Sequence, residues 1–305
     1  MKRSRRHFEH RLAQNIKDDR KSFFAYARSR VQVGPLQDSR GQEVKEAGAM
    51  AEVCNQQFSS VFTAEDVANV PSHENTFRRD VTDRLVHIEI GVDAEKSRLE
   101  KLREDKSPGD DDLSPRLLKM ISEEVAEPVT ILFNQSMNEG DVPLDWKSAN
   151  VTSIFKKGCR NQPDNYRPAS LTSQLSKVLE SIIRDAITRH LDRHKLIQDS
   201  QHGFRRGSSC TTNILEFLDM VTDTINQKGN VDVIFLDFTK AFDKVPHRRL
   251  LAKLQAHGID GQVMRWVASW LKGRKQSVCI DGHSSGWVDV LSGILQGSAS
   301  VRYCF

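Results

Sequence analysis

The sequence contains no run of eighteen apolar residues and no closely spaced pair of cysteines. The first absence argues against a membrane-spanning helix. The five cysteines are scattered and form no CxxC pair, which excludes a zinc ribbon and a disulfide framework and is typical of a reducing compartment. The basic start, Met1 to Arg6, is not followed by an apolar stretch, so a secretory signal is excluded. We therefore expect an intracellular protein, located in the cytoplasm, the nucleus or both.

The composition indicates a soluble, globular chain with an uneven charge. Its 305 residues are 38% hydrophobic and 28% charged, which is enough for one large or two ordinary domains. Residues 1–30 carry ten Lys and Arg against three acidic residues, so this tail has a net charge of +7, whereas the rest of the chain has a net charge of −3 and the whole chain of +4. A basic tail favours contact with a polyanion. A solvated helix and a localisation signal explain the same charge equally well.

The N-terminal part reads as a helical extension of the main domain. Apolar residues recur at helical spacing over residues 3–31 and again over 45–62, and a polar stretch without periodicity at 64–80 reads as a linker. We expect a boundary at residue 80, with a basic helical extension at 1–80 and the main domain at 81–305.

Local signals predict several elements in the main domain. Ser148 to Phe155 and Asn165 to Leu171 read as two strands joined by a basic loop, which makes a hairpin with Lys and Arg at its tip. Thr172 and Ser173 can cap a helix with one long apolar stripe, on which Glu180 is expected to face away from the core. A further helix is expected from Thr211 to about Gln227.

Three short signals predict where other elements begin or turn. Ser114 and Pro115 can start a helix by N-cap and N1 chemistry. Pro246 enforces a break, after which His247 begins a helical pattern. Asp281-Gly282 between two alternating stretches is a hairpin signal.

The stretch from Val231 to His247 is the most informative in the chain. Val231 to Leu236 is an apolar run rich in β-branched and aromatic residues, which predicts a strand buried on both faces. Asp237 follows directly, and a carboxylate at the end of a buried strand usually points into a site because it needs a cation or a donor. Taken alone, Asp237 is more simply explained as a helix cap or a salt-bridge partner.

The residues around Asp237 favour the functional explanation. Leu-Asp-Phe-Thr-Lys-Ala-Phe-Asp at 236–243 resembles the first catalytic motif of reverse transcriptases, in the form used by non-LTR retrotransposons. The resemblance implies that Asp237 binds the catalytic metal ions, helped by the carbonyl of Phe238. It also implies that Phe242 lies beneath the sugar of the incoming nucleotide.

Four other stretches resemble motifs of the same family, in the family order. Lys106 to Asp112 resembles the signature that opens its polymerase domain. The hairpin resembles the finger motif whose Lys and Arg grip the triphosphate, which implies this role for Lys156 and Arg167, with Lys157 as an alternative to Lys156. Gln201 to Ser209 resembles a motif that lies near template and nucleotide, which implies template contact for Gly203, Phe204 and Arg205. Ser292 to Ser298 resembles the second palm motif, which implies nucleotide and template contact for Gln296 and Gly297.

The resemblance implies an α+β fold of the right-hand polymerase type, with fingers and an incomplete palm but no thumb. The family's next motif, aromatic-Ala-Asp-Asp, supplies the other catalytic carboxylates and does not occur in the sequence. We therefore expect a truncated polymerase that is inactive by itself.

Two hypotheses for the function follow. The first is an RNA-directed DNA polymerase of a non-LTR retrotransposon, which acts on an RNA template, a DNA primer and deoxynucleoside triphosphates with two Mg²⁺ ions, or with Mn²⁺. The second is a non-catalytic remnant of such an element that only binds nucleic acid. The sequence leaves the oligomeric state open.

Overall fold

A computed structural model of the chain describes residues 33–66, 68, 81–203, 205 and 207–294. The helix expected over residues 3–31 and most of the expected linker lie outside these residues. The structure is a mixture of helices and strands that divides into two units. The first unit comprises Met1–Ser60, Asn150–Ala169 and Gln276–Val288, and the second comprises Val61–Ala149, Ser170–Lys275 and Asp289–Phe305.

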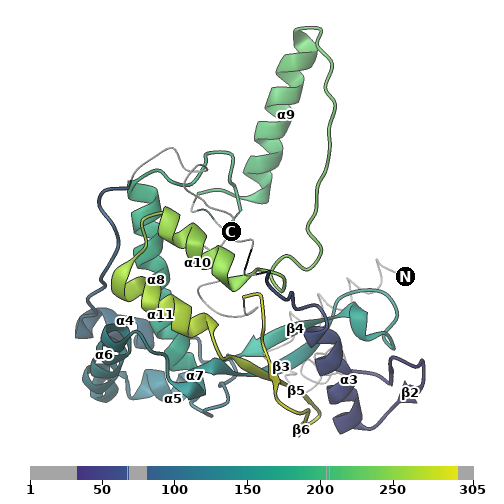
Figure 1. Cartoon of the computed structure of the whole chain (residues 1–305), viewed down its shortest axis with the longest axis vertical. Coiled ribbons are helices and arrows are strands. Elements are labelled where there is room, and N and C mark those ends of the chain that lie inside the picture. The colour runs from purple at the N-terminus through teal and green to yellow at the C-terminus, as the bar shows by residue number, and fades with distance from the viewer. Residues whose placement is uncertain (1–32, 67, 69–80, 204, 206, 295–305) are drawn as a thin grey trace, which may run out of the picture. The chain divides into compact units, whose positions relative to one another are not determined.

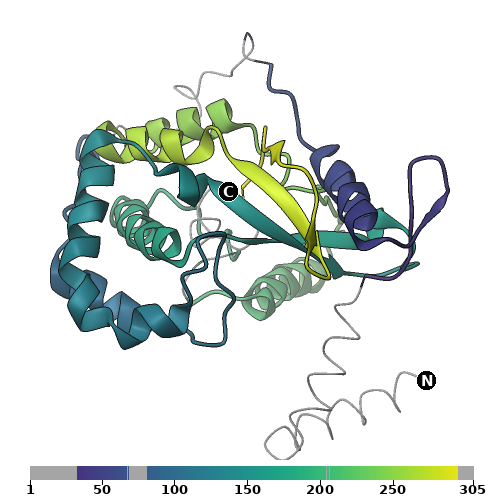
Figure 2. The ribbon, with the colours of Figure 1, turned by 90° about the horizontal axis from the view of Figure 1, so that it is seen from below.

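The first unit is built on a small sheet in which strands distant in the sequence are neighbours. β3 (Ser148–Phe155) lies between β4 (Tyr166–Leu171) and β5 (Lys275–Ile280), and β5 also pairs with β6 (His283–Ser284) and β7 (Val288–Asp289). Figure 2 shows β3 in teal and β5 in yellow side by side. The predicted strands at 148–155 and 165–171 are thereby confirmed. Asp281 and Gly282 both have positive φ, the geometry of the tight hairpin that their sequence predicts.

Helix α3 (Ala47–Ser59) covers the core of this unit. Apolar side chains of α3 pack with those of the sheet in a single buried cluster that includes Met50, Cys54, Phe58, Val151 and Val278. A short hairpin of β1 (Leu36–Gln37) and β2 (Glu43–Val44) precedes the helix. The helix expected over 45–62 is thus confirmed, with a buried face centred on Cys54.

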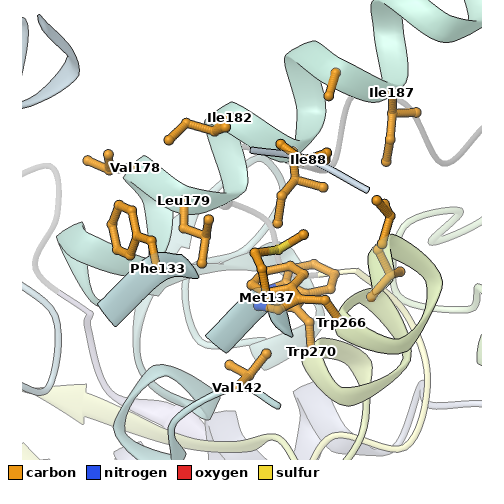
Figure 3. Close-up of a cluster of buried hydrophobic side chains, with 14 of the residues drawn as sticks. Ile88, Phe133, Met137, Val142, Val178, Leu179, Ile182, Ile187, Trp266 and Trp270 are labelled. Carbon is orange, nitrogen blue, oxygen red and sulfur yellow. The ribbon is translucent and has the colours of Figure 1, made fainter. Parts of the chain in front are cut away.

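The second unit is helical and has the larger core (Figure 3). Its helices are α4 (Val92–Glu100), α5 (Pro115–Met120), α6 (Ser122–Glu139), α7 (Leu144–Lys147), α8 (Gln174–Arg193), α9 (Cys210–Asn226), α10 (His247–Ala256) and α11 (Gly261–Leu271). Helices α6, α8 and α11 contribute Phe133, Met137, Leu179 and Trp266 to the centre of the core. No helix of the described residues is long and apolar enough to cross a membrane.

Helix α8 begins as predicted, but one of its residues is placed differently. The Ser173 side chain caps its first turn, and the predicted apolar stripe is buried. Glu180, expected on the exposed side, is fully buried. Its Oε1 accepts hydrogen bonds from Ser176 Oγ at 2.9 Å and from Trp270 Nε1 at 3.1 Å. Two buried donors, one of them from α11, therefore pair with this side chain, and a periodicity argument on α8 alone does not reveal them.

Glu95 of α4 is a buried carboxylate of a different kind. Its side chain is 0% exposed, and neither carboxylate oxygen has a hydrogen-bond partner. Burial raises the pKa of this carboxyl from 4.5 to about 7, because an unpaired charge is costly in a low-dielectric interior. The protonated form is therefore favoured by folding, and its contribution to stability is complete below pH 4.5 and is lost as the pH rises to 7.

We expect Glu95→Gln to stabilise the chain at pH 8 by up to about 3 kcal/mol and to have little effect at pH 4, because glutamine keeps the shape without the ionisation. Urea unfolding at the two pH values measures the difference. Glu100→Gln, an exposed position on the same helix, is the matched control. Equal pH dependence in Glu95→Gln and the parent chain would show that Glu95 ionises freely.

The prediction of a buried strand at Val231 to Leu236 is wrong. These residues have no regular secondary structure, and Ile234, Phe235 and Leu236 are 83%, 87% and 89% exposed. A strand needs neighbours for its backbone groups, and no backbone hydrogen bond joins residues 231–238 to any other part of the chain that the structure describes. The helix expected before it is confirmed as α9, which the Ser209–Thr212 capping box begins (Figure 1).

Candidate functional site

The β3–β4 hairpin presents two of the predicted cations on one face. Val151, Ser153 and Tyr166 are buried, so the alternation of the strands directs Lys156 and Arg167 to the opposite side, where both are exposed. The Lys156 amide donates to Asn165 O at 2.8 Å. This hydrogen bond closes the hairpin close to Lys156 and Arg167. Neither side chain makes an ion pair with another described residue.

The loop between these strands is held by its own side chains. The Tyr166 hydroxyl donates to Arg160 O at 2.7 Å, and Asn165 Nδ2 donates to Cys159 O at 2.9 Å. The Arg160 guanidinium lies over the Phe155 ring, 4.9 Å from its centroid. Such a fixed frame can present cations to a phosphate with little loss of entropy on binding.

Residues 239–247 form a tight turn after Asp237 and lead into α10. Lys240 has a φ of +55°, and its carbonyl accepts from the amides of Asp243 at 3.0 Å and Lys244 at 3.2 Å. Pro246 is the N-cap residue of α10, and the helix begins at His247 as predicted. Phe242 is partly buried within this turn, whereas Asp237 and Phe238 before it are exposed.

A second predicted motif, starting at Ser292, packs against this turn. The Ile294 amide donates to Phe242 O at 2.9 Å, and the Gly293 amide donates to Val245 O at 2.8 Å. Ser292 Oγ donates to Asp243 O at 2.8 Å. Two motifs about fifty residues apart in the sequence therefore meet in the structure. Gln296 and Gly297 of the second motif lie outside the described residues.

Gly293 makes this contact possible. It has a φ of +86°, and a Cβ at this position would lie 2.6 Å from Asp243 O and 2.7 Å from Phe242 O. Glycine alone adopts this conformation without strain and allows such a close backbone approach. The sequence showed Ser292 and Gly293 as part of a motif, but gave no role to either residue.

The expected metal site is only partly represented. Asp237 is an exposed carboxylate that can supply one oxygen ligand. In the part of the chain that the structure describes, no group of three or more His, Cys, Asp and Glu side chains is placed to hold a metal ion. These residues do not make a complete two-metal site, which needs several carboxylates around a pair of ions.

In the loop expected to contact the template, Arg205 forms hydrogen bonds with nearby residues of the same chain segment. Arg205 donates through both terminal nitrogens to Asp199 Oδ1, at 3.2 and 3.1 Å, and also to Gln198 O at 3.3 Å. Gly203 is exposed, and Phe204 lies outside the described residues. Template contact by Gly203, Phe204 and Arg205 stays a prediction.

Comparison with known proteins gives a consistent result. A family model described as "Reverse transcriptase (RNA-dependent DNA polymerase)" matches residues 154–305. The chain is 30% identical over 210 residues to the RNA-directed DNA polymerase from mobile element jockey of Drosophila melanogaster. The aligned region covers 68% of this chain and 23% of that protein. It is 25% identical over 278 residues to the probable RNA-directed DNA polymerase from transposon X-element of the same organism, covering 88% of this chain and 30% of that protein. The chain thus spans less than a third of the length of these relatives.

Proposed function

Because this chain belongs to the reverse transcriptase family of non-LTR retrotransposons, we propose that it supplies the nucleotide-binding part of an RNA-directed DNA polymerase. The observation that carries the proposal is the docking of residues 292–294 on the turn that holds Phe242. The contact orders the turn immediately after Asp237. The proposed reaction is attack of a primer 3′-hydroxyl on the α-phosphate of a deoxynucleotide, directed by an RNA template.

Each part of the proposed site has its own task. Lys156 and Arg167 bind the triphosphate, for which a guanidinium supplies a fork that matches phosphate oxygens. Phe242 contacts the sugar and selects deoxyribonucleotides, because its ring leaves no room for a 2′-hydroxyl. Gln296 and Gly297 contact the nucleotide and the template. In subdomain terms, the β3–β4 hairpin belongs to the fingers, and the turn at 239–247 belongs to the palm.

A two-metal reaction requires more metal ligands than these residues supply. When bound, two Mg²⁺ or Mn²⁺ ions supply charge stabilisation for the attacking and leaving oxygens, and Asp237 would be one of their ligands. We propose that further polymerase residues supply the other ligands and cover the exposed apolar residues near Asp237, since an exposed apolar surface of this kind usually marks an interface. Helix α9 shows the same property, because Ile214, Leu215 and Leu218 are 57%, 60% and 49% exposed.

The second candidate is a non-catalytic nucleic-acid-binding protein, located in the cytoplasm or the nucleus. The exposure of residues 234–238 and the single carboxylate at Asp237 favour it for this chain by itself. It would retain the basic residues 1–30 for contact with RNA. Deoxynucleotide binding separates the two candidates, because a protein that binds only RNA does not need a triphosphate site.

The test of the proposed function is binding of a deoxynucleoside triphosphate to the chain with an RNA template and a DNA primer. We expect Arg167→Ala to weaken binding about tenfold or more, and Lys156→Ala to weaken it comparably, because each removes a charge-assisted contact to phosphate. Isothermal titration or photocrosslinking measures the affinity.

Arg40→Ala is the matched control, since Arg40 is an exposed cation of the same unit. Lys157→Ala tests the alternative assignment, and a loss there without a loss in Lys156→Ala would transfer the role to Lys157. The proposed function is wrong if the parent chain does not bind the nucleotide at all.

A further inference from the structure

Residues 61–66 overlap the expected linker, yet they are fixed to the turn that carries Phe242. The Thr63 amide donates to Ser292 Oγ at 2.8 Å, and that hydroxyl donates to Asp243 O at 2.8 Å. Ser292 is 1% exposed. One buried hydroxyl therefore joins this segment to the turn, as an acceptor on one side and a donor on the other.

Glu65 makes a second contact, with the first turn of α10. Its Oε2 accepts from the Arg248 amide at 2.9 Å, and its Oε1 accepts from the Arg249 amide at 3.0 Å. These amides have no acceptor within the helix. The N-cap residue, Pro246, makes no side-chain cap, and the first turn contains no acidic residue. Glu65 thus supplies, from 183 residues away, both the acceptors and the negative charge that the start of a helix favours.

These two contacts hold both ends of the same turn. Ser292 to Ile294 fix its carbonyls at Phe242 and Asp243, and His247 Nε2 lies 2.9 Å from Gly293 O at its far end. Glu65 binds the first turn of α10, where the helix leaves this turn. A shift of the first turn of α10 would therefore be transmitted to Phe242, which lies only five residues before it.

From these contacts we infer that Glu65 is a positioning residue for selection of the nucleotide sugar. It caps α10 and so fixes the turn that carries Phe242, which separates deoxyribonucleotides from ribonucleotides. The inference rests on the proposed function, and it adds a residue of the expected linker to the determinants of specificity.

The chemistry of the contact indicates which variants discriminate. Glutamine has one side-chain acceptor, and its NH₂ group would face an amide N–H, so Glu65→Gln loses one hydrogen bond and the charge. Aspartate keeps two acceptors and the charge on a shorter side chain, so Glu65→Asp should retain part of the function. Glu89→Gln is the control, because Glu89 is an exposed acid of the same unit.

The experiment compares the affinities of dCTP and CTP, which differ only in the 2′-hydroxyl, for the full chain bound to an RNA template and a DNA primer. We expect the parent chain and Glu89→Gln to prefer dCTP. Glu65→Gln should reduce this preference about tenfold, because small displacements of a positioning group are costly, and Glu65→Asp should lie between them. Hydrogen exchange in the same samples should show faster exchange of the Arg248 and Arg249 amides in Glu65→Gln.

The measurements distinguish failure of this inference from failure of the proposed function. If Glu65→Gln exchanges faster at α10 but keeps the full preference for dCTP, Glu65 is a helix cap only and the inference is wrong. If the exchange at α10 is unchanged, the contact itself does not hold in solution and the inference is also wrong. If the parent chain does not distinguish dCTP from CTP, the assignment of Phe242 in the proposed function fails and takes this inference with it.

Discussion

A DNA primer annealed to an RNA template should not be extended by this 305-residue chain, with either magnesium or manganese present. Magnesium prefers six oxygen ligands and binds weakly to a single carboxylate among waters. Asp237 is one exposed carboxylate, and the described residues hold no group of acids that could complete a metal site. Asp243, six residues after Asp237, belongs to no such group among the described residues either. Asp232, five residues before Asp237, is separated by about 16 Å if the chain between them is extended.

A longer chain tests the role of Asp237 directly. Joining this chain to the segment that follows the matched region in the jockey polymerase should produce extension, if that segment supplies the remaining carboxylates. Asp237→Asn should then reduce the rate on the order of a thousandfold, since several kcal/mol of transition-state stabilisation depend on the metal ions. Asp232→Asn, which changes an exposed acid of the same stretch, should extend normally. Robust extension by the unmodified chain that depends on Asp237 would contradict this account of the site.

The elements predicted correctly are those whose signals are local. The Ser173 cap and the apolar stripe of α8 specify its start and its buried face, and the alternation in β3 specifies a strand with bounds that the structure reproduces. The helix at Ser114 and Pro115 follows in the same way from N-cap chemistry. In each case, neighbouring residues determine the backbone conformation, and tertiary packing agrees with them.

The predictions that fail are those that depend on which strands or helices pack against an element in the folded chain. The composition of Val231 to Leu236 shows that these residues are suited to a buried strand, but it does not show which strands would flank it. The sequence does not reveal helix α6, because the helix follows α5 directly and contains Pro128, a residue that usually ends a helical pattern. The burial of Glu95 and Glu180 likewise depends on which helices pack against theirs.

The candidate site also combines residues that the sequence identifies with contacts that only the structure reveals. The sequence places Asp237, Phe242, Lys156 and Arg167 by resemblance to a family, and the structure adds how two of the motifs meet. The hydrogen bonds from Ser292 to Asp243 and from α10 to Glu65 join residues 49 and 183 positions apart. No periodicity or capping rule relates such positions, so only the folded chain reveals these contacts.

The largest effect of a single methyl group is expected at Gly293. In Gly293→Ala the new Cβ would meet the carbonyl oxygens of Asp243 and Phe242 at 2.6 and 2.7 Å, and both belong to the backbone, so neither can move aside without displacing the turn. The positive φ adds about 1–2 kcal/mol of strain for any residue with a Cβ. In a polymerising chain, we expect Gly293→Ala to reduce deoxynucleotide incorporation about a hundredfold or more, because displacement of a positioning group by about 1 Å has this cost.

Gly273→Ala separates the two causes. Gly273 also has a positive φ, of +69°, but a Cβ at this position would meet no atom within 4 Å. Its alanine variant therefore carries the backbone strain without the collision, and it should lose stability while retaining incorporation. Thermal unfolding and steady-state kinetics measured on both variants distinguish the outcomes. If the two alanine variants lose incorporation equally, backbone strain explains the loss and the contact between Gly293 and the Phe242 turn has no specific part in catalysis. A loss confined to Gly293→Ala would show that polymerisation requires the close approach of these two motifs.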